Sequence, residues 1–111
     1  MSMRKLSLDA VAREQLKQAK ESTNKRSART VYGGHEHVLR QSVIALVEGA
    51  VMAEHESPGE ATIHVLQGRV RITAGKDSWD CRNGDLLDVP EDRHSLLALE
   101  PSVVLLTVAK P

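Results

Sequence analysis

Aromatic side chains are nearly absent from this chain, which contains Tyr32, Trp79 and no phenylalanine. Any hydrophobic core must therefore be built from valine, leucine and isoleucine. Aromatic platforms for sugars or for the bases of single-stranded nucleic acids are equally scarce, and this disfavours both kinds of ligand. Cysteine is almost missing too. Because Cys81 is alone, no intrachain disulfide can form, and a secreted disulfide scaffold is excluded.

Long apolar runs are also missing. No segment approaches the roughly 20 apolar residues that a membrane-spanning helix needs. The start of the chain runs into charged side chains and never reaches an apolar stretch of signal-peptide length. We therefore expect a cytoplasmic protein without a membrane partner. The length of 111 residues suits one domain with a single core.

Charge of one sign does not dominate either, because fifteen basic residues balance fifteen acidic ones. This balance gives no overall field that would favour nucleic acid as a partner. The charges are nevertheless distributed unevenly along the chain. Residues 1–30 carry eight lysines and arginines against three acidic residues, so this segment has a net charge of +5 and the remainder a net charge of −5.

The order of apolar and turn residues predicts one helix followed by many short strands. Leu8, Val11 and Leu16 recur at helical spacing, which predicts a helix over residues 8–22. Residues 22–29 have no periodicity and are interpreted as a linker. Strands are expected near 30–32, 37–47, 50–56, 61–67, 69–74, 78–81, 85–89, 94–99 and 102–109. Short strands at this spacing are typical of an all-β barrel or sandwich.

Two of the expected hairpins each place a histidine at a fixed distance after a glycine. These histidines are His55 and His94. Because strand side chains alternate between two faces, His55 is expected to share one inward face with Val51 and Ala53. Two hairpins that each deliver one imidazole inward would line a pocket inside a small barrel.

The same two segments resemble the two sequence motifs of the cupin superfamily. The first motif is glycine, five residues, His-x-His, three or four residues, glutamate, six residues and glycine. The second is glycine, five residues, Pro-x-Gly, two residues and histidine. The matching positions are Gly49, His55 and Gly68 in the first motif, and Gly84, Pro90 and, one residue early, His94 in the second. The resemblance covers residues 40–108 and is to small single-domain cupins of the cupin 2 conserved-barrel type.

The resemblance implies an all-β fold, a cupin-type antiparallel β-barrel (double-stranded β-helix or jelly roll) preceded by a short N-terminal α-helix. It divides the chain into an N-terminal helix and linker, residues 1–29, and a barrel, residues 30–111. It also implies a homodimer, formed through a barrel face or an exchanged N-terminal strand. The thin apolar stripe of the helix agrees with this, because such a helix needs a surface to cover it.

Members of the superfamily usually hold a divalent metal, such as zinc, iron, manganese or nickel, with three histidines and one glutamate. Only His55 and His94 carry over to this chain. Ser57 stands at the position of the second histidine, and Ala61 at that of the glutamate. The resemblance therefore implies a metal site that is incomplete unless other residues supply ligands.

Two further histidines are candidate replacements for the missing ligands. In an extended segment, His35 and His37 would lie on one face about 6.8 Å apart and could point at a shared centre. The alternative is that they occupy a surface turn and contact solvent or a partner subunit. Gln41 continues the same alternation and is a candidate to line the ligand pocket. Ser57, as a hydrogen-bond donor, and Trp79, as a cap, complete the predicted pocket.

Three functional hypotheses follow from these patterns. In the first, the barrel binds a small organic ligand and its metal site is weak or lost. In the second, the chain is a metal-dependent enzyme, dioxygenase- or isomerase-like by family resemblance, which acts on a small organic acid and uses His35 or His37 to complete the metal site. In the third, the basic N-terminal helix makes the chain an interaction or regulatory protein that binds nucleic acid or a protein partner. The absence of a recognisable recognition sequence in the helix disfavours nucleic acid.

Overall fold

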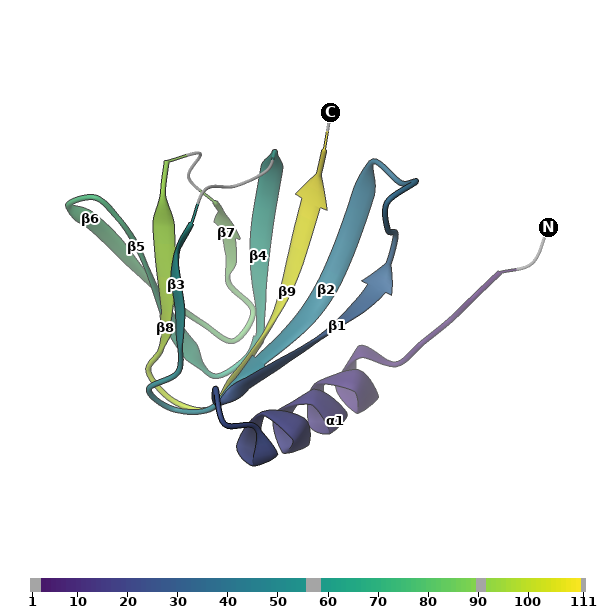
Figure 1. Ribbon diagram of the computed structural model, residues 1–111, viewed down its shortest axis with the longest axis horizontal. Helices are drawn as coiled ribbons and strands as arrows, with labels where there is room; N and C mark the ends of the chain where they lie inside the picture. The colour runs from purple at the N-terminus through teal and green to yellow at the C-terminus, as the bar shows by residue number, and fades with distance from the viewer. Residues whose placement is uncertain (1–2, 56–58, 90–91, 111) are drawn as a thin grey trace.

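The computed structural model describes residues 3–55, 59–89 and 92–110, which form one helix and nine strands (Figure 1). The elements are α1 (Leu8–Glu21), β1 (Arg26–Tyr32), β2 (Leu39–Leu46), β3 (Val51–His55), β4 (Glu60–Gln67), β5 (Arg69–Ala74), β6 (Asp77–Arg82), β7 (Leu86–Asp88), β8 (His94–Ala98) and β9 (Ser102–Ala109). A five-stranded sheet of order β1-β2-β9-β4-β7 faces a four-stranded sheet of order β3-β8-β5-β6. The strand pairings are antiparallel, so the expected all-β barrel class is confirmed.

The core between the two sheets is aliphatic, as the lack of aromatic residues predicts. Alternate residues of β4 are buried there, namely Ala61, Ile63 and Val65, and so are Val70 and Ile72 of β5. Each fully buried aliphatic side chain contributes about 1.5–3 kcal/mol to folding. The remaining members of the cluster are Ile44, Leu46, Ala50, Cys81, Val89, Leu96, Ala98, Val104 and Val108.

Helix α1 covers part of the outer face of the five-stranded sheet, which is the face turned away from the other sheet. The helix begins at a capping residue, because Ser7 Oγ accepts a hydrogen bond from Ala10 N–H at 3.1 Å. The buried Val11 packs in a second cluster with Val43 of β2 and Val103 of β9. The sheet thus covers the thin apolar stripe of the helix within one chain. No helix in the described ranges is long and apolar enough to span a membrane.

Strand β1 begins inside the segment that the sequence pattern assigned to a linker, so that assignment is wrong for residues 26–29. β1 pairs with β2 from Arg26, opposite Leu46, onward. It is an edge strand whose side chains are half-buried or exposed, so it has no alternation of apolar and polar residues. The Arg26 guanidinium donates a hydrogen bond to the Val51 carbonyl at 2.7 Å and ties this edge to β3 of the other sheet.

The prediction that Val51 and Ala53 lie on the inward face of β3 is also wrong. Val51 and Ala53 are exposed, whereas Met52 lies opposite Leu96 and packs against the core. The register then shifts between Met52 and His55, as at a β-bulge, which reverses the alternation of the strand. This irregularity places the backbone of position 55, in place of position 54, opposite His94.

Candidate functional site

A small cavity lies between the two sheets, and His94 is the one polar residue among the described residues that line it. Its volume is about 30 Å³, which is close to the space that a single water molecule takes up. The other lining residues are Ile44, Met52, Ile63, Ile72, Leu96, Val104 and Leu106. Among the described residues, this part of the barrel interior is therefore almost filled by side chains.

His94 is the first residue of β8 and is 5% exposed. Its Nδ1 lies 3.0 Å from the main-chain carbonyl oxygen of Asp92. A carbonyl oxygen only accepts, so Nδ1 must carry the proton in this contact. In a neutral ring the lone pair is then on Nε2, which can accept a hydrogen bond or ligate a metal. The main-chain carbonyl of Asp92 thus determines that the proton is on Nδ1.

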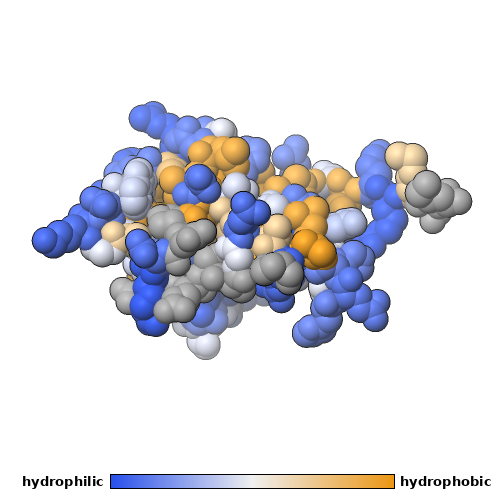
Figure 2. Space-filling view, turned by 90° about the horizontal axis from the view of Figure 1, so that it is seen from above, coloured by the Kyte–Doolittle hydropathy of each residue, from blue (hydrophilic) through white to orange (hydrophobic). Residues whose placement is uncertain are grey.

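The two histidine positions meet at one end of the barrel, where β3 and β7 end and β4 and β8 begin (Figure 1). We call this end the mouth. His55 and His94 are Cα partners in the antiparallel pair of β3 and β8, and residues directly opposite in such a pair share a face of the sheet. Figure 2 looks onto this end of the molecule, where apolar side chains are exposed among polar ones. The two motifs therefore converge at the backbone level.

His35 and His37 do not have the expected extended geometry. They lie in the connection between β1 and β2, where His35 is in a turn and the His37 N–H donates to the Gly34 carbonyl at 3.2 Å. Both side chains are exposed. The His37 ring makes an edge-to-face contact with Tyr32, with centroids 5.6 Å apart. The two glycines before His35 favour a turn here over a continued strand.

The remaining predicted pocket residues lie elsewhere or outside the described ranges. Gln41 is on the outer face of the five-stranded sheet, where its Nε2 donates to Thr107 Oγ1 at 3.2 Å, so it does not line the cavity beside His94. Trp79 lies opposite Ile72 on the edge strand β6 and is 40% exposed, and it is not among the described residues that line the cavity. Ser57 lies outside the described residues.

The donors near the mouth in the described part of the chain do not match the usual cupin metal site. Ala61, at the glutamate position, is 8% exposed and belongs to the inner core cluster, so a methyl group stands where a carboxylate would bind the ion. The neighbouring Glu60 is exposed on the outer face. Within residues 3–55, 59–89 and 92–110, no group of three or more His, Cys, Asp or Glu residues is placed to hold a metal.

Sequence reasoning missed a second opening beside the cavity. Ile44 and Met52 line the cavity and also a larger space of about 250 Å³ next to Arg26 and Asn24. This space adjoins β1 and β3, the edges of the two sheets, which Arg26 bridges. No pattern of neighbouring residues in the sequence indicates this space, because its existence depends on how the edges of the two sheets pack together. Met52 is an unbranched, flexible side chain that contacts both spaces.

Cys81 is a buried core residue. It is 7% exposed and lies on β6 opposite Val70. Burial, with smaller contributions from Asp85 and Asp80, raises the pKa of the thiol. We therefore expect a thiol reagent such as DTNB to label the native protein at least about a hundredfold more slowly than the urea-unfolded chain.

A matched control for this labelling experiment uses an exposed residue of the same strand. In a Cys81→Ala background, Ser78→Cys places the thiol at an exposed position of β6 and should be labelled rapidly in the native state. Equally rapid labelling of native Cys81 would show that this part of the core opens readily.

Comparison with solved structures identifies the fold. A conserved protein of unknown function from Streptococcus pyogenes superposes with a TM-score of 0.74 and 26% identity, over 100% of this chain and 91% of that chain. A cupin superfamily protein from Desulfitobacterium hafniense has a TM-score of 0.74 and 19% identity, over 100% and 94% of the two chains. KdgF from a Halomonas species has a TM-score of 0.66 and 24% identity, over 78% and 81%. No family model and no curated protein matches the sequence. The structural likenesses establish that the chain has the cupin fold, which confirms the resemblance of its motifs.

Proposed function

We propose that this protein binds a small organic molecule at the mouth of its cupin barrel, through His94 and His55, and holds no metal tightly. The observation that carries the proposal is the register of β3 and β8 together with burial. His55 and His94 are Cα partners, and the His94 imidazole is 5% exposed beside an apolar cavity. An apolar site with a few polar anchors is the usual composition of a small-molecule pocket.

The dimensions of the cavity and the position of His94 indicate the class of ligand. A cavity of about 30 Å³ admits only a small group, so most of the ligand must lie in the mouth. The contact of His94 Nδ1 with the Asp92 carbonyl orients the imidazole as a polar anchor beside this cavity. These features favour small organic molecules that combine an apolar body with a hydroxyl group. Binding is favoured over metal-dependent catalysis because Ala61 offers a metal no ligand.

Nuclear magnetic resonance of the isotope-labelled protein tests the proposal with phenol, cyclohexanol and 3-hydroxybutyrate as probes. We expect at least one probe at millimolar concentration to shift the amide resonances of Ile72 and Leu96 saturably. These shifts should be lost in His94→Ala. They should persist in His64→Ala, because His64 is a half-buried histidine of the outer face, opposite Leu86 and Leu105.

Two outcomes would count against the proposal. If no probe shifts these resonances, or if His94→Ala responds like the wild type, the mouth is not the binding site. Metal content tests the second part, after growth in medium supplemented with zinc, iron, manganese and nickel. One equivalent of bound metal that disappears in His94→Ala would overturn the metal-free proposal and favour the enzyme hypothesis.

A further inference from the structure

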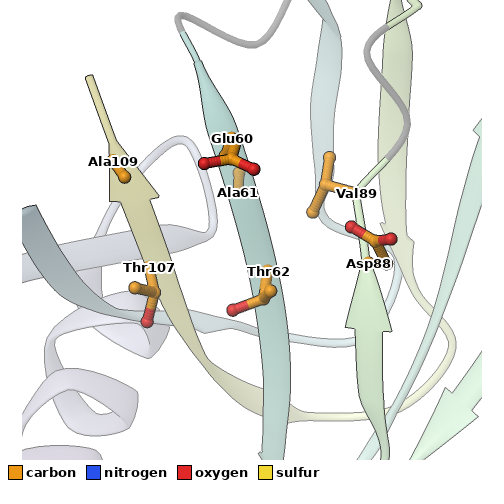
Figure 3. A pocket seen from close by; sticks show the side chains of 7 residues that line it. All are labelled: Glu60, Ala61, Thr62, Asp88, Val89, Thr107 and Ala109. Carbon is orange, nitrogen blue, oxygen red and sulfur yellow. The ribbon is translucent and has the colours of Figure 1, made fainter. Parts of the chain in front are cut away.

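The outer face of the five-stranded sheet carries two pockets that differ in charge. Figure 3 shows the first, of about 540 Å³, where Glu60 of β4 and Asp88 of β7 give the lining two carboxylates. The second, which we call the helix-side pocket, has a volume of about 470 Å³ and lies between the sheet and the segment that leads into α1. Pockets of roughly 300–1,000 Å³ are typical of small-molecule sites, so the helix-side pocket is large enough for a ligand.

Four of the residues that line the helix-side pocket are aliphatic, namely Leu6, Leu8, Val31 and Leu105. Leu8 of α1, Val31 of β1 and Leu105 of β9 pack against the second core cluster, so the contact between helix and sheet fixes their positions. Leu6 precedes the helix and is 37% exposed. An aliphatic ligand that covers these side chains would remove apolar surface from water, which favours binding.

The polar lining of this pocket includes Tyr32 and Gln41, which are Cα partners in the pairing of β1 with β2. The Gln41 Nε2 donates to Thr107 Oγ1 at 3.2 Å. A side-chain amide has two N–H groups, so the second one can donate to a ligand oxygen. The Tyr32 ring is held by its edge-to-face contact with His37.

Arg4 is the one charged residue among the described residues that line the helix-side pocket. It is exposed and forms no ion pair within residues 3–55, 59–89 and 92–110. It belongs to the basic segment 1–30, in which eight basic residues against three acidic ones leave a net charge of +5. A guanidinium binds a carboxylate through two parallel hydrogen bonds. The pocket therefore suits a ligand with one negative charge and an aliphatic body.

We propose that the helix-side pocket is a second ligand site, separate from the barrel mouth, and that it binds a small aliphatic carboxylate. The Arg4 guanidinium pairs with the carboxylate, and Gln41 donates its second N–H to the same group. The aliphatic chain lies against Leu8, Val31 and Leu105. A carboxylate is favoured over a phosphate monoester because its single charge matches the single cation of the lining.

Nuclear magnetic resonance of the isotope-labelled full-length protein tests this site with octanoate as the probe. Millimolar octanoate should shift the amide resonances of Val31 and Leu105 saturably. The resonances of Ile72 and Leu96 report on the barrel mouth, so the two sites are observed separately. Octanol, which has the same chain without the charge, should bind at least about fivefold more weakly, because it lacks the charge-assisted hydrogen bonds.

Two variants test the polar contacts. Arg4→Gln should raise the octanoate dissociation constant at least about fivefold and leave that of octanol unchanged, because only the charged head contacts Arg4. Gln41→Glu preserves the shape of the side chain and an acceptor for the Thr107 hydroxyl, but it places a negative charge beside the carboxylate. It should weaken octanoate at least about tenfold, because like charges oppose binding.

The matched control is Lys5→Gln, which removes a positive charge from an exposed neighbour that is not among the described residues lining the pocket. It should bind octanoate like the wild type. The proposal is overturned if octanoate does not shift Val31 and Leu105, if octanol binds as tightly, or if Arg4→Gln and Lys5→Gln have equal effects. Shifts that depend on protein concentration and not on octanoate would show that a second copy covers the pocket, and would also overturn it.

Discussion

Replacing Ala61 with glutamate and Ser57 with histidine is expected to create a tight metal site at the barrel mouth. The double variant would supply four ligands of the kinds found in cupin metal sites, together with His55 and His94. Ala61 is 8% exposed on the inner side of β4, so a carboxylate there is buried and unfavourable until a cation compensates it. Cobalt should bind at least about a thousandfold more tightly than to the wild type, as expected when a ligand set is completed.

Isothermal titration with cobalt and the unfolding temperature with and without cobalt measure this gain. Because the ion binds the folded state, the unfolding temperature of the double variant should rise with cobalt concentration. The matched control is Ser57→His with Thr62→Glu, which adds the same groups but puts the carboxylate on the outer face, where Thr62 lies opposite Thr107. If both double variants bind cobalt equally, the correspondence between Ala61 and the cupin glutamate is wrong.

The second large effect is expected at Gly68, where the chain crosses from the five-stranded to the four-stranded sheet. This residue has φ +94°, and a Cβ atom there would collide with the Ser102 side chain and with the Pro101 carbonyl. Ser102 is fully buried, and its Oγ accepts a hydrogen bond from Arg69 N–H at 3.0 Å. Gly68→Ala should therefore lower the free energy of unfolding by about 2–5 kcal/mol, from backbone strain and overpacking combined.

Urea denaturation measures this loss, and Gly75→Ala provides the control. Gly75 also has a positive φ, +60°, but nothing lies within 4 Å of its added Cβ. This variant should lose only the backbone contribution, about 1–2 kcal/mol. Equal losses in the two variants would show that the close packing at Ser102 does not contribute to stability.

Most of the strands and the helix could be predicted from the sequence because their signals are local. Alternation of apolar residues identifies β4 and β5, whose inner residues Ile63 and Ile72 are buried. Glycine, proline and asparagine mark the turns between strands. The predicted range of β9, 102–109, agrees with the observed strand, and α1 ends at Glu21, one residue before the expected end.

The candidate site was predictable in part. The spacing of the two motifs indicated that His55 and His94 belong together, and the structure pairs their backbone positions. The reasoning through Val51 and Ala53 was nevertheless wrong, because the register shift after Met52 reverses the alternation. A bulge depends on the partner strand, and the sequence of β3 alone does not reveal it.

By itself, the sequence determined the aliphatic core, the order of the strands along the chain and the cupin motifs, since each depends on neighbouring residues or on fixed spacing. Only the tertiary structure decided that residues 26–32 form an edge strand and that Gln41 faces outward. It also decided that Glu60, Thr62 and Asp88 line one pocket on the outer face. These features depend on which strands pair and which surfaces α1 covers, and those contacts join residues far apart in the chain.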